Sequence, residues 1–365
     1  MSTSPRVEPS PSDVSGRTSP DHRAPPTDRG ATPRPATVSL PVTLLVDLPN
    51  WVGDLAMALP LVDRVVRSNG PGRTILHARP TAERLLRAMF PTASVATVPP
   101  KTSPFTAARR VVHRGGRVDL GISLRNAWRA KIFLRLVARR AWGSASSGGW
   151  MLDRTVTPDP RRHQRHDWDG FLEALSLDPI ADPPLVTPRD LCREGRGRLA
   201  DVAPGEVVGL APGAAGWESK RWPPERFGTL ARRLDDTGRR PVVVVGPGEE
   251  PVAAQVAEAS GLRLPVVGAD TDVAGLAGLV AELDLVVGND SGPVQLAAVL
   301  GTPVVAIFGP TDPDRTRPVG PTARVVRRPL ECAPCRRSTC PLGHHACMTE
   351  LSVAEVMEAV DDLVG

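Results

Sequence analysis

The feature that most constrains the fold is an alternation of short apolar runs with longer amphipathic stretches, which recurs along most of the chain. The run VTLLVDLP begins at Val42, and the stretch from Asp54 to Arg67 that follows has apolar residues at helical spacing. A short apolar run bounded by turn residues is typical of a buried strand. Strands that alternate with helices predict a parallel sheet wound with helices, so we expect an α/β protein.

Two sets of alternating elements predict two doubly wound domains that face a cleft. We expect strands at TILHARP, SVATVP and VDLGISL, and again at VVGLAPG, PVVVVGP, LPVVGA, LDLVVGND and PVVAIFGP. We place the N-terminal domain at residues 41–200 and the C-terminal domain at residues 201–365. The pattern weakens between about 146 and 205, where we expect the linker and a helix at about 166–176. Ligands of such sheets bind beyond the carboxyl ends of the strands.

The amphipathic stretches of the second set predict a series of helices. We expect helices at 224–236, 250–260, 272–283 and 292–300. The segment SVAEVMEAVDDLV predicts a terminal helix with Ser352 as its N-cap, because a serine hydroxyl can accept a hydrogen bond from a free amide in the first turn.

The composition outside these sets limits the class of protein. Residues 1–40 are rich in Pro, Ser, Thr and charge without hydrophobic periodicity, which predicts a disordered tail. Apolar residues make up 41% and charged residues 23% of the chain, as in globular proteins. No apolar run approaches the ~20 residues that a membrane-spanning helix needs, and no signal peptide is visible. We therefore expect a cytoplasmic protein.

One stretch of the chain is strongly basic. From Phe105 to Arg165 there are 14 Lys and Arg residues against three Asp residues. Within it, the segment AWRAKIFLRLVARRAW (127–142) predicts a basic helix with aromatic ends. Such a surface could face an anionic acceptor or a membrane, or simply solvent. Nucleic acid is the less favoured partner because no recognised nucleic-acid module accompanies the charge.

The first chemically informative turn is LPNWVGDLAMALP, at residues 48–60. A strand ends there and a helix begins, which brings Asn50, Trp51, Gly53 and Asp54 to the mouth of the sheet. A carboxylate at that place can accept a proton from a substrate hydroxyl, so Asp54 is a candidate general base. The alternative is that Asp54 only caps the helix.

Two turns in the second half could bind a phosphorylated ligand. The segment LAPGAAGWESKRWPPERF contains Lys220, one of three lysines among 45 basic residues, and Gly-rich turns can cradle phosphate. The alternative is a solvated basic loop. The segment GPGEEP contains Glu249, which could accept hydrogen bonds from ribose hydroxyls or could serve as a carboxylate at a helix N-terminus.

A third turn in this half lies within LVVGNDSGPVQLAAVLGTPVVAIFGPTDP, at residues 285–313. Asp290 could accept hydrogen bonds from sugar hydroxyls. The amides of Ser291 and Gly292 lie at a predicted helix N-terminus, which is a suitable place for an anion. The alternative is that Asp290 or Ser291 caps the helix and does nothing more.

Four of the five cysteines cluster near the C-terminus with the spacing C-x2-C-x4-C-x6-C. They are Cys332, Cys335, Cys340 and Cys347. This spacing could hold zinc in a closed tetrahedral site, hold an iron–sulfur cluster, form disulfides or leave free thiols. Cys192 stands apart and is expected to be a packing residue.

Four motifs in this order resemble glycosyltransferase family 9, the ADP-heptose:lipopolysaccharide heptosyltransferases, with the heptosyltransferase II branch nearest. They are NWVGD, PGAAGWESKRWP, GNDSGPVQLAA followed by GTPVVAIFGPTDP, and CAPCRRSTCPLGHHAC. The resemblance covers about residues 42–364. It implies a GT-B fold with two Rossmann-like domains, in which the C-terminal domain holds most of the nucleotide sugar. It also implies an inverting, metal-independent transfer.

The resemblance also implies a role for each matching residue. Asp54 corresponds to the catalytic base and Lys220 to the lysine that contacts the donor diphosphate. Asp290 corresponds to the aspartate that contacts the donor sugar, and Ser291 with Gly292 to the adjacent phosphate-binding turn.

Two further positions complete the implied donor site. Glu249 corresponds to a ribose-binding glutamate. Gln295 stands where the family commonly has His, and a glutamine can hold a hydrogen bond but cannot shuttle a proton. Donor or acceptor choice in this chain can therefore differ from that of the family.

The function implied is transfer of a heptose or related sugar from an ADP-activated donor to a hydroxyl of an anionic glycan or glycolipid. No cofactor is expected for catalysis, and zinc or an iron–sulfur cluster at the cysteines would be structural. Peripheral contact with the inner face of the membrane fits such an acceptor. The alternatives are a different nucleotide sugar with a cell-wall glycan or small metabolite as acceptor, a non-catalytic nucleotide-sugar binding protein, or a metal or redox protein.

Overall fold

The structure is a computed structural model that describes residues 38–180, 184–320 and 322–364. The predicted tail at 1–40 lies outside the described residues except for its last three. One of these, Val38, is buried, and its backbone N–H donates a hydrogen bond to the Ala174 carbonyl (3.1 Å). No helix within the described ranges is long and apolar enough to cross a membrane.

The first half contains a six-stranded parallel sheet in the order β3-β2-β1-β4-β5-β6. Its strands are β1 (Leu44–Asp47), β2 (Thr74–Ala78), β3 (Ser94–Thr97), β4 (Val118–Ser123), β5 (Ala138–Ser144) and β6 (Arg154–Val156). The helices and single turns around it are α1 (Val52–Asn69), η1 (Pro80–Ala82), α2 (Glu83–Met89), α3 (Pro104–Gly115), α4 (Trp128–Val137), η2 (Gly149–Met151), η3 (Gln164–Trp168) and α5 (Asp169–Ala174).

The second half repeats this plan with a parallel sheet in the order β12-β11-β10-β7-β8-β9. Its strands are β7 (Val207–Ala211), β8 (Arg240–Val244), β9 (Val266–Val267), β10 (Leu285–Asn289), β11 (Val304–Phe308) and β12 (Ala323–Arg327). Its helices are α6 (Arg189–Arg198), η4 (Glu218–Lys220), α7 (Pro224–Asp236), α8 (Glu250–Ser260), α9 (Val273–Val280), α10 (Gly292–Leu300), α11 (Pro313–Thr316), α12 (Ala346–Thr349) and α13 (Val353–Val364).

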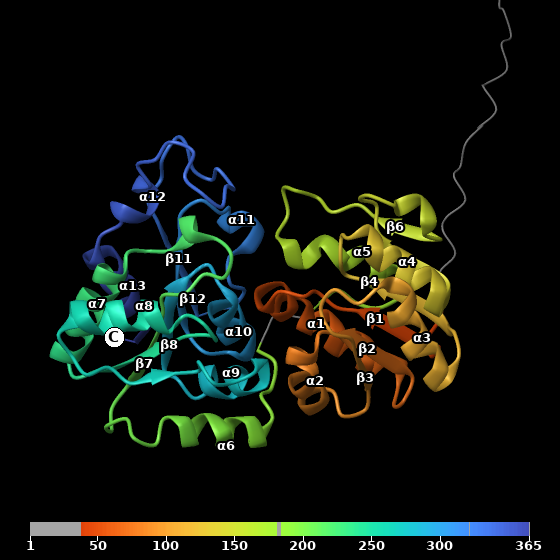
Figure 1. Cartoon of the computed structure of the whole chain (residues 1–365), viewed down its shortest axis with the longest axis horizontal. Helices are drawn as coiled ribbons and strands as arrows, with labels where there is room; N and C mark the ends of the chain where they lie inside the picture. Colours follow the sequence, from red (N-terminus) through yellow and green to blue (C-terminus); the bar gives the residue numbers. More distant parts are fainter. Residues whose placement is uncertain (1–37, 181–183, 321, 365) are drawn as a thin grey trace, which may run out of the picture. The chain divides into compact units, whose positions relative to one another are not determined.

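Alternating side chains explain why helices lie on both faces of each sheet (Figure 1). In β1, Leu44 and Val46 join the core cluster that includes α1, whereas Leu45 joins the cluster that includes α3 and α4. Successive side chains of a strand point to opposite faces, so a strand with every residue buried needs cover on both sides. The prediction of two doubly wound parallel sheets is confirmed.

The predicted helix over 127–142 is wrong in its second part. The helix α4 ends at Val137, and the next seven residues form β5. The segment ARRAWGS has no decisive helical or strand periodicity, and β5 is a strand because it pairs with β4 on one side and β6 on the other. The edge strands β6 and β12 were also not predicted.

The remaining helices of the second half begin and end close to the predicted residues. The N-cap prediction for Ser352 is confirmed, because its hydroxyl accepts a hydrogen bond from the Glu355 amide (3.2 Å). The Glu355 carboxylate in turn accepts a hydrogen bond from the Ser352 amide (2.8 Å), which completes a capping box.

The helix α6 packs on α9, although its residues lie within the predicted linker and the predicted N-terminal domain. A Cβ atom at Gly195 would lie 2.1 Å from the carbonyl oxygen of Gly278. The two helices therefore meet backbone to backbone, and only glycine allows this approach.

Candidate functional site

A cavity of about 850 Å³ lies at the carboxyl ends of strands from both sheets. Its walls come from the turn after β1 and from the turns after β7, β8 and β10, the edge where ligands of parallel sheets bind. The cavity brings together most of the residues predicted for the site, namely Trp51, Gly53, Asp54, Lys220, Glu249, Asp290, Ser291, Gly292 and Gln295.

A smaller cavity of about 260 Å³ adjoins the first. Asn50 lines this smaller cavity, while Trp51, Asp54 and Gln164 line both. The two cavities therefore meet at Asp54 and its neighbours Trp51 and Gln164. Such a junction is where a group held in one cavity can react with a group held in the other.

Asp54 is the third residue of α1, and Trp51 is the N-cap residue, so Asp54 does not cap the helix. Its carboxylate instead accepts a hydrogen bond from the side-chain amide of Gln164 (3.0 Å). Burial raises the pKa of Asp54 above its usual value, although the Gln164 hydrogen bond and the charge of Lys220 oppose the rise. A carboxylate with a raised pKa is a stronger base when it is ionised.

Lys220 is not part of a solvated loop. Its ammonium group lies 2.9 Å from the Asp290 carboxylate and 3.3 Å from the Asp290 carbonyl oxygen. The side chain of Asp290 is 6% exposed and that of Lys220 is 20% exposed. The ammonium group also lies 5.1 Å from the centre of the Trp217 ring, within range of a cation–π contact.

A buried asparagine holds the two turns that carry this pair. The side-chain amide of Asn289 donates to the Pro212 carbonyl (2.7 Å), and its side-chain oxygen accepts from the Trp222 amide (2.9 Å). The last residue of β10 thus fixes the loop between β7 and α7. Lys220 and Asp290 meet because their loops are cross-linked at this point.

The N-terminus of α10 faces the cavity without a side-chain cap. Ser291 occupies the N-cap position, and its buried hydroxyl has no hydrogen-bond partner among the described residues. Asp290 accepts from Lys220 and Gln295 rather than from the helix amides. Neither side chain therefore makes a capping hydrogen bond to this helix. A Cβ atom at Gly292 would lie 2.8 Å from Cβ of Val52, so α10 begins directly against α1.

Glu249 and Gln295 lie on the wall of the large cavity. The Glu249 carboxylate accepts a hydrogen bond from the Gly246 amide (2.9 Å) in the turn after β8. The Gln295 amide donates to the Thr316 carbonyl (2.5 Å) and lies 3.4 Å from the Asp290 carboxylate. Gln295 is 4% exposed, so its contact with the Asp290 carboxylate is shielded from solvent.

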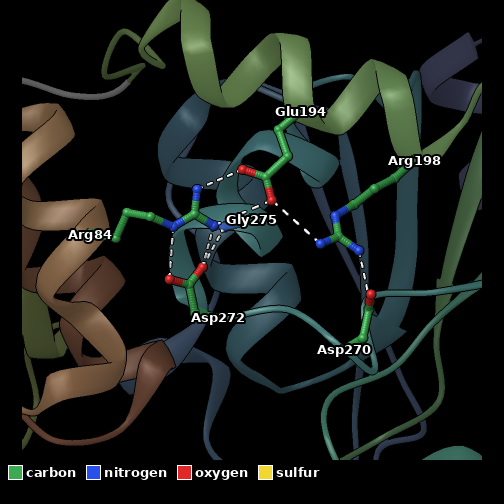
Figure 2. A network of polar contacts seen from close by, with 6 residues as sticks. All are labelled: Arg84, Glu194, Arg198, Asp270, Asp272 and Gly275. Carbon is green, nitrogen blue, oxygen red and sulfur yellow. Dashed lines mark hydrogen bonds and ion pairs between the residues drawn. The ribbon is translucent and has the colours of Figure 1, made fainter.

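A polar network that was not predicted from the sequence reaches the cavity wall through Asp272 (Figure 2). The guanidinium group of Arg84 on α2 contacts Asp272 (2.5 Å) and Glu194 (2.6 Å). Asp272 also caps α9 through the Gly275 amide (2.9 Å). Arg84 therefore ties α2 to α6 and α9. No sequence signal indicates this contact, because Arg84 and Asp272 are 188 residues apart.

The four clustered cysteines line a small cavity of about 20 Å³ together with His344 and His345. They form no disulfide, and within the described ranges no group of three or more His, Cys, Asp or Glu side chains is arranged to hold a metal ion. Burial and the neighbouring thiols raise the pKa of Cys347 to about 11. Cys192 is a free, partly buried thiol.

The cysteine segment packs against the loop that carries Lys220. The hydroxyl of Ser219 donates to the Arg337 carbonyl (2.6 Å), and the ring of His345 contacts the Ser219 carbonyl (2.6 Å). The segment therefore helps to hold the residue next to Lys220.

The basic stretch displays two exposed tryptophans, one of which is next to a residue of the small cavity. Trp128 begins α4 directly after Ala127, which lines that cavity, and Trp150 is 88% exposed. The buried ammonium group of Lys131 donates to the carbonyl groups of Ser146 and Ser147 (2.7 Å each). Lys131 thus fixes the loop that leads to Trp150.

Comparison with known proteins places this geometry in a family. The model of glycosyltransferase family 9 (heptosyltransferase) matches residues 109–346, more than half of the chain. Lipooligosaccharide heptosyltransferase 2 of Campylobacter jejuni is 26% identical over 325 residues, which cover 88% of this chain and 98% of that protein.

Two solved structures share the fold. The E. coli ADP-heptose lipopolysaccharide heptosyltransferase II has a TM-score of 0.74 at 21% identity, with 88% of this chain and 98% of that chain covered. An E. coli heptosyltransferase with ADP has a TM-score of 0.68 at 19% identity, with 87% and 99% covered. The predicted GT-B arrangement is confirmed, and the chain belongs to glycosyltransferase family 9, the heptosyltransferases.

Proposed function

We propose that this glycosyltransferase moves a heptose from ADP-heptose to a hydroxyl of an anionic glycan or glycolipid, with inversion at the anomeric carbon. The observation that carries the proposal is the junction of the two cavities at Asp54, with the Lys220–Asp290 pair on the donor side. The names of the relatives, which are lipopolysaccharide and lipooligosaccharide heptosyltransferases, support the sugar and the acceptor class.

Asp54 acts as the general base in the proposed reaction. The acceptor hydroxyl gives its proton to the Asp54 carboxylate while its oxygen forms a bond to the anomeric carbon. The bond from that carbon to the diphosphate breaks, and ADP leaves with the electron pair. One displacement inverts the anomeric centre, so no second carboxylate is needed as a nucleophile.

The leaving diphosphate is stabilised by charges that are already in place. Lys220 supplies an ammonium group, and the uncapped amides of Ser291 and Gly292 supply donors at the N-terminus of α10. Asp290 accepts hydrogen bonds from donor-sugar hydroxyls, and Glu249 does the same for the ribose. Gln295 holds Asp290 by a neutral hydrogen bond in the place of the family's histidine.

The first experiment measures ligand-induced thermal shifts with ADP, UDP, GDP and their sugar conjugates. Selective stabilisation by ADP or ADP-heptose is expected, because binding to the native state alone raises its stability. Preference for UDP or GDP would overturn the donor assignment while keeping the family, and Gln295 would then mark a changed specificity. No response to any nucleotide would favour a protein that does not bind nucleotide sugars.

We propose that the acceptor approaches over the basic stretch and that the protein contacts an anionic membrane surface there. Trp128 and Trp150 are exposed, and tryptophan and arginine together favour the interface of an anionic bilayer. Sedimentation with vesicles of phosphatidylglycerol and phosphatidylcholine tests this, with Trp150→Ala as the variant. Binding that is equal with pure phosphatidylcholine vesicles, or is unchanged in the variant, would overturn it.

We propose, from their spacing, that the four cysteines bind a structural zinc ion or iron–sulfur cluster that is not needed for the chemistry, although their described side chains are not arranged as a metal site and would have to move to ligate one. Their shared cavity and the contacts of Ser219 with this segment support a stiffening role for the Lys220 loop. Metal analysis of the purified protein is expected to give a constant ratio to chain that is lost in Cys340→Ser. If freshly purified protein contains no metal, the cysteines are free thiols or disulfides, and thiol titration distinguishes these two states.

A further inference from the structure

The segment 159–168 lies between β6 and α5 and touches both cavities. Trp168 is buried in the core of the first half, and Gln164 lines both cavities and donates to the Asp54 carboxylate (3.0 Å). The segment lies in the part of the sequence where the alternating pattern is weak. Its Gln164 side chain nevertheless contacts the candidate base directly.

The short helix α11 of the second half holds this segment. The guanidinium group of Arg315 contacts both carboxylate oxygens of Asp167 (3.1 and 2.8 Å) and donates to the Asp159 carbonyl (2.8 Å). The side chains of Arg315 and Asp167 are 18% and 11% exposed. A bidentate pair with this little exposure fixes both distance and orientation.

A buried histidine, His163, provides a second link between this segment and the residue that follows α11. His163 is 8% exposed, and its Nε2 lies 2.8 Å from the carbonyl oxygen of Arg317. Burial lowers the pKa of His163 to about 4, so the ring is neutral at physiological pH. Nε2–H then donates to this carbonyl, and Nδ1 accepts from the Arg165 amide (3.2 Å).

The same helix also contacts the donor side of the site. The Thr316 carbonyl accepts a hydrogen bond from Gln295 (2.5 Å), whose amide lies 3.4 Å from Asp290. The C-terminal end of α11 thus lies between the donor-side aspartate and the segment that carries Gln164.

We infer that Gln164 is the positioning residue of Asp54 and that residues 159–168 form a strap, anchored on α11, that holds it there. The inference rests on the proposed role of Asp54 as base. The Gln164 amide occupies Oδ1 of Asp54 and leaves Oδ2 for the acceptor hydroxyl. Its donated hydrogen bond also limits the rise in the pKa of Asp54 that burial causes. Through the strap, the contact between Gln164 and Asp54 depends on where α11 of the second half lies relative to Asp54.

The variants Gln164→Leu and Gln164→Glu remove the donor. Turnover is expected to fall about tenfold, and the acidic limb of the kcat/KM profile is expected to move up by about one pH unit, because one hydrogen bond to a carboxylate is lost. The shift is expected to be larger for Gln164→Glu, which adds a like charge. The Kd for ADP is expected to stay unchanged. Gln255→Leu, at an exposed position on α8, is the matched control.

An unchanged pH profile in both Gln164 variants would overturn the positioning role. The strap is tested with Asp167→Asn, alone and combined with Gln164→Leu. If the Arg315 pair acts through Gln164, the two changes together are expected to lower turnover no more than Gln164→Leu alone. If the double variant instead loses turnover by the product of the two single losses, Asp167 acts independently of Gln164, and this result would overturn the strap.

A measurement without turnover separates this inference from the proposed function. The pKa of Asp54 can be followed by NMR with aspartate labelled at the carboxyl carbon, and the signal is assigned by its loss in Asp54→Asn. A higher pKa in Gln164→Leu supports the contact even if Asp54→Asn keeps full activity, a result that would remove Asp54 as base. The same pKa in wild type and variant would overturn the contact whatever the activity.

Discussion

Replacement of Lys220 by methionine tests how the buried ion pair supports the fold and the donor site. The change keeps a side chain of similar length but removes the ammonium group 2.9 Å from the Asp290 carboxylate. Asp290 is 6% exposed, and the Gln295 amide at 3.4 Å is a weak replacement. Loss of one partner of a buried pair costs about 3–5 kcal/mol. Lys220 is one-fifth exposed, so we expect about 2–3 kcal/mol.

The assay is thermal melting of the whole chain without ligand. A loss of this size is expected to lower the melting temperature by about 3–4 °C, because the entropy of unfolding is about 2.1 cal/mol/K per residue. The double variant Lys220→Met with Asp290→Asn is expected to recover most of the loss, because no unpaired charge stays buried. Neither variant is expected to be stabilised by ADP. Lys101→Met, at an exposed lysine, is the control. The reasoning would be refuted if Lys220→Met had the melting temperature of the wild type, or if the double variant melted no higher than Lys220→Met.

Three further variants test the candidate base, the packing of α6 on α9 and the network around Arg84. Asp54→Asn is expected to lower turnover by about 10²–10⁴-fold with ADP binding retained, and full activity would exclude Asp54 as base. Because burial raises the pKa of Asp54, ionisation weakens the fold, so this variant is expected to melt higher than wild type at pH 8 but not at a pH below the ordinary pKa of an aspartate. Gly195→Ala is expected to destabilise the protein by about 1–3 kcal/mol, because the added Cβ atom would meet the backbone of Gly278. The control is Gly197→Ala, whose Cβ atom would meet no atom within 4 Å, and this variant is expected to be neutral or stabilising. Equal melting temperatures of the two variants would contradict the close packing of α6 on α9. Arg84→Met is expected to cost about 1 kcal/mol at low salt and less at high salt, and a salt-independent loss would show that packing rather than charge holds the network.

Most elements were predictable because periodicity and turn chemistry are local. Within the run VTLLVDLP, Leu44–Asp47 form β1 with all four residues buried, and the Pro at the first position of α7 marks the start of that helix. The prediction was wrong where a segment is short and takes its structure from its neighbours. In 127–142 the same basic composition forms a helix and then a strand, and the pairing of β5 decides the difference.

The candidate site was predictable in part for a geometric reason. Turns that follow parallel strands meet at one edge of a sheet, so Asp54, Lys220 and Asp290 could be expected to lie near one another. Gln164 could not be expected, since it lies 110 residues from Asp54 in a region without periodicity. Its role depends on Arg315 and Asp167, whose pairing no spacing indicates.

The sequence by itself determined the two parallel sheets, the turns at their carboxyl ends and the family, because each is encoded within short stretches of chain. Only the tertiary structure decided which partner each polar group has. It pairs Lys220 with Asp290 and Gln164 with Asp54, and it sets the direction in which the pKa of Asp54 moves. Desolvation and ion pairing depend on which distant segments exclude water from a group, and that depends on the packing of the whole chain.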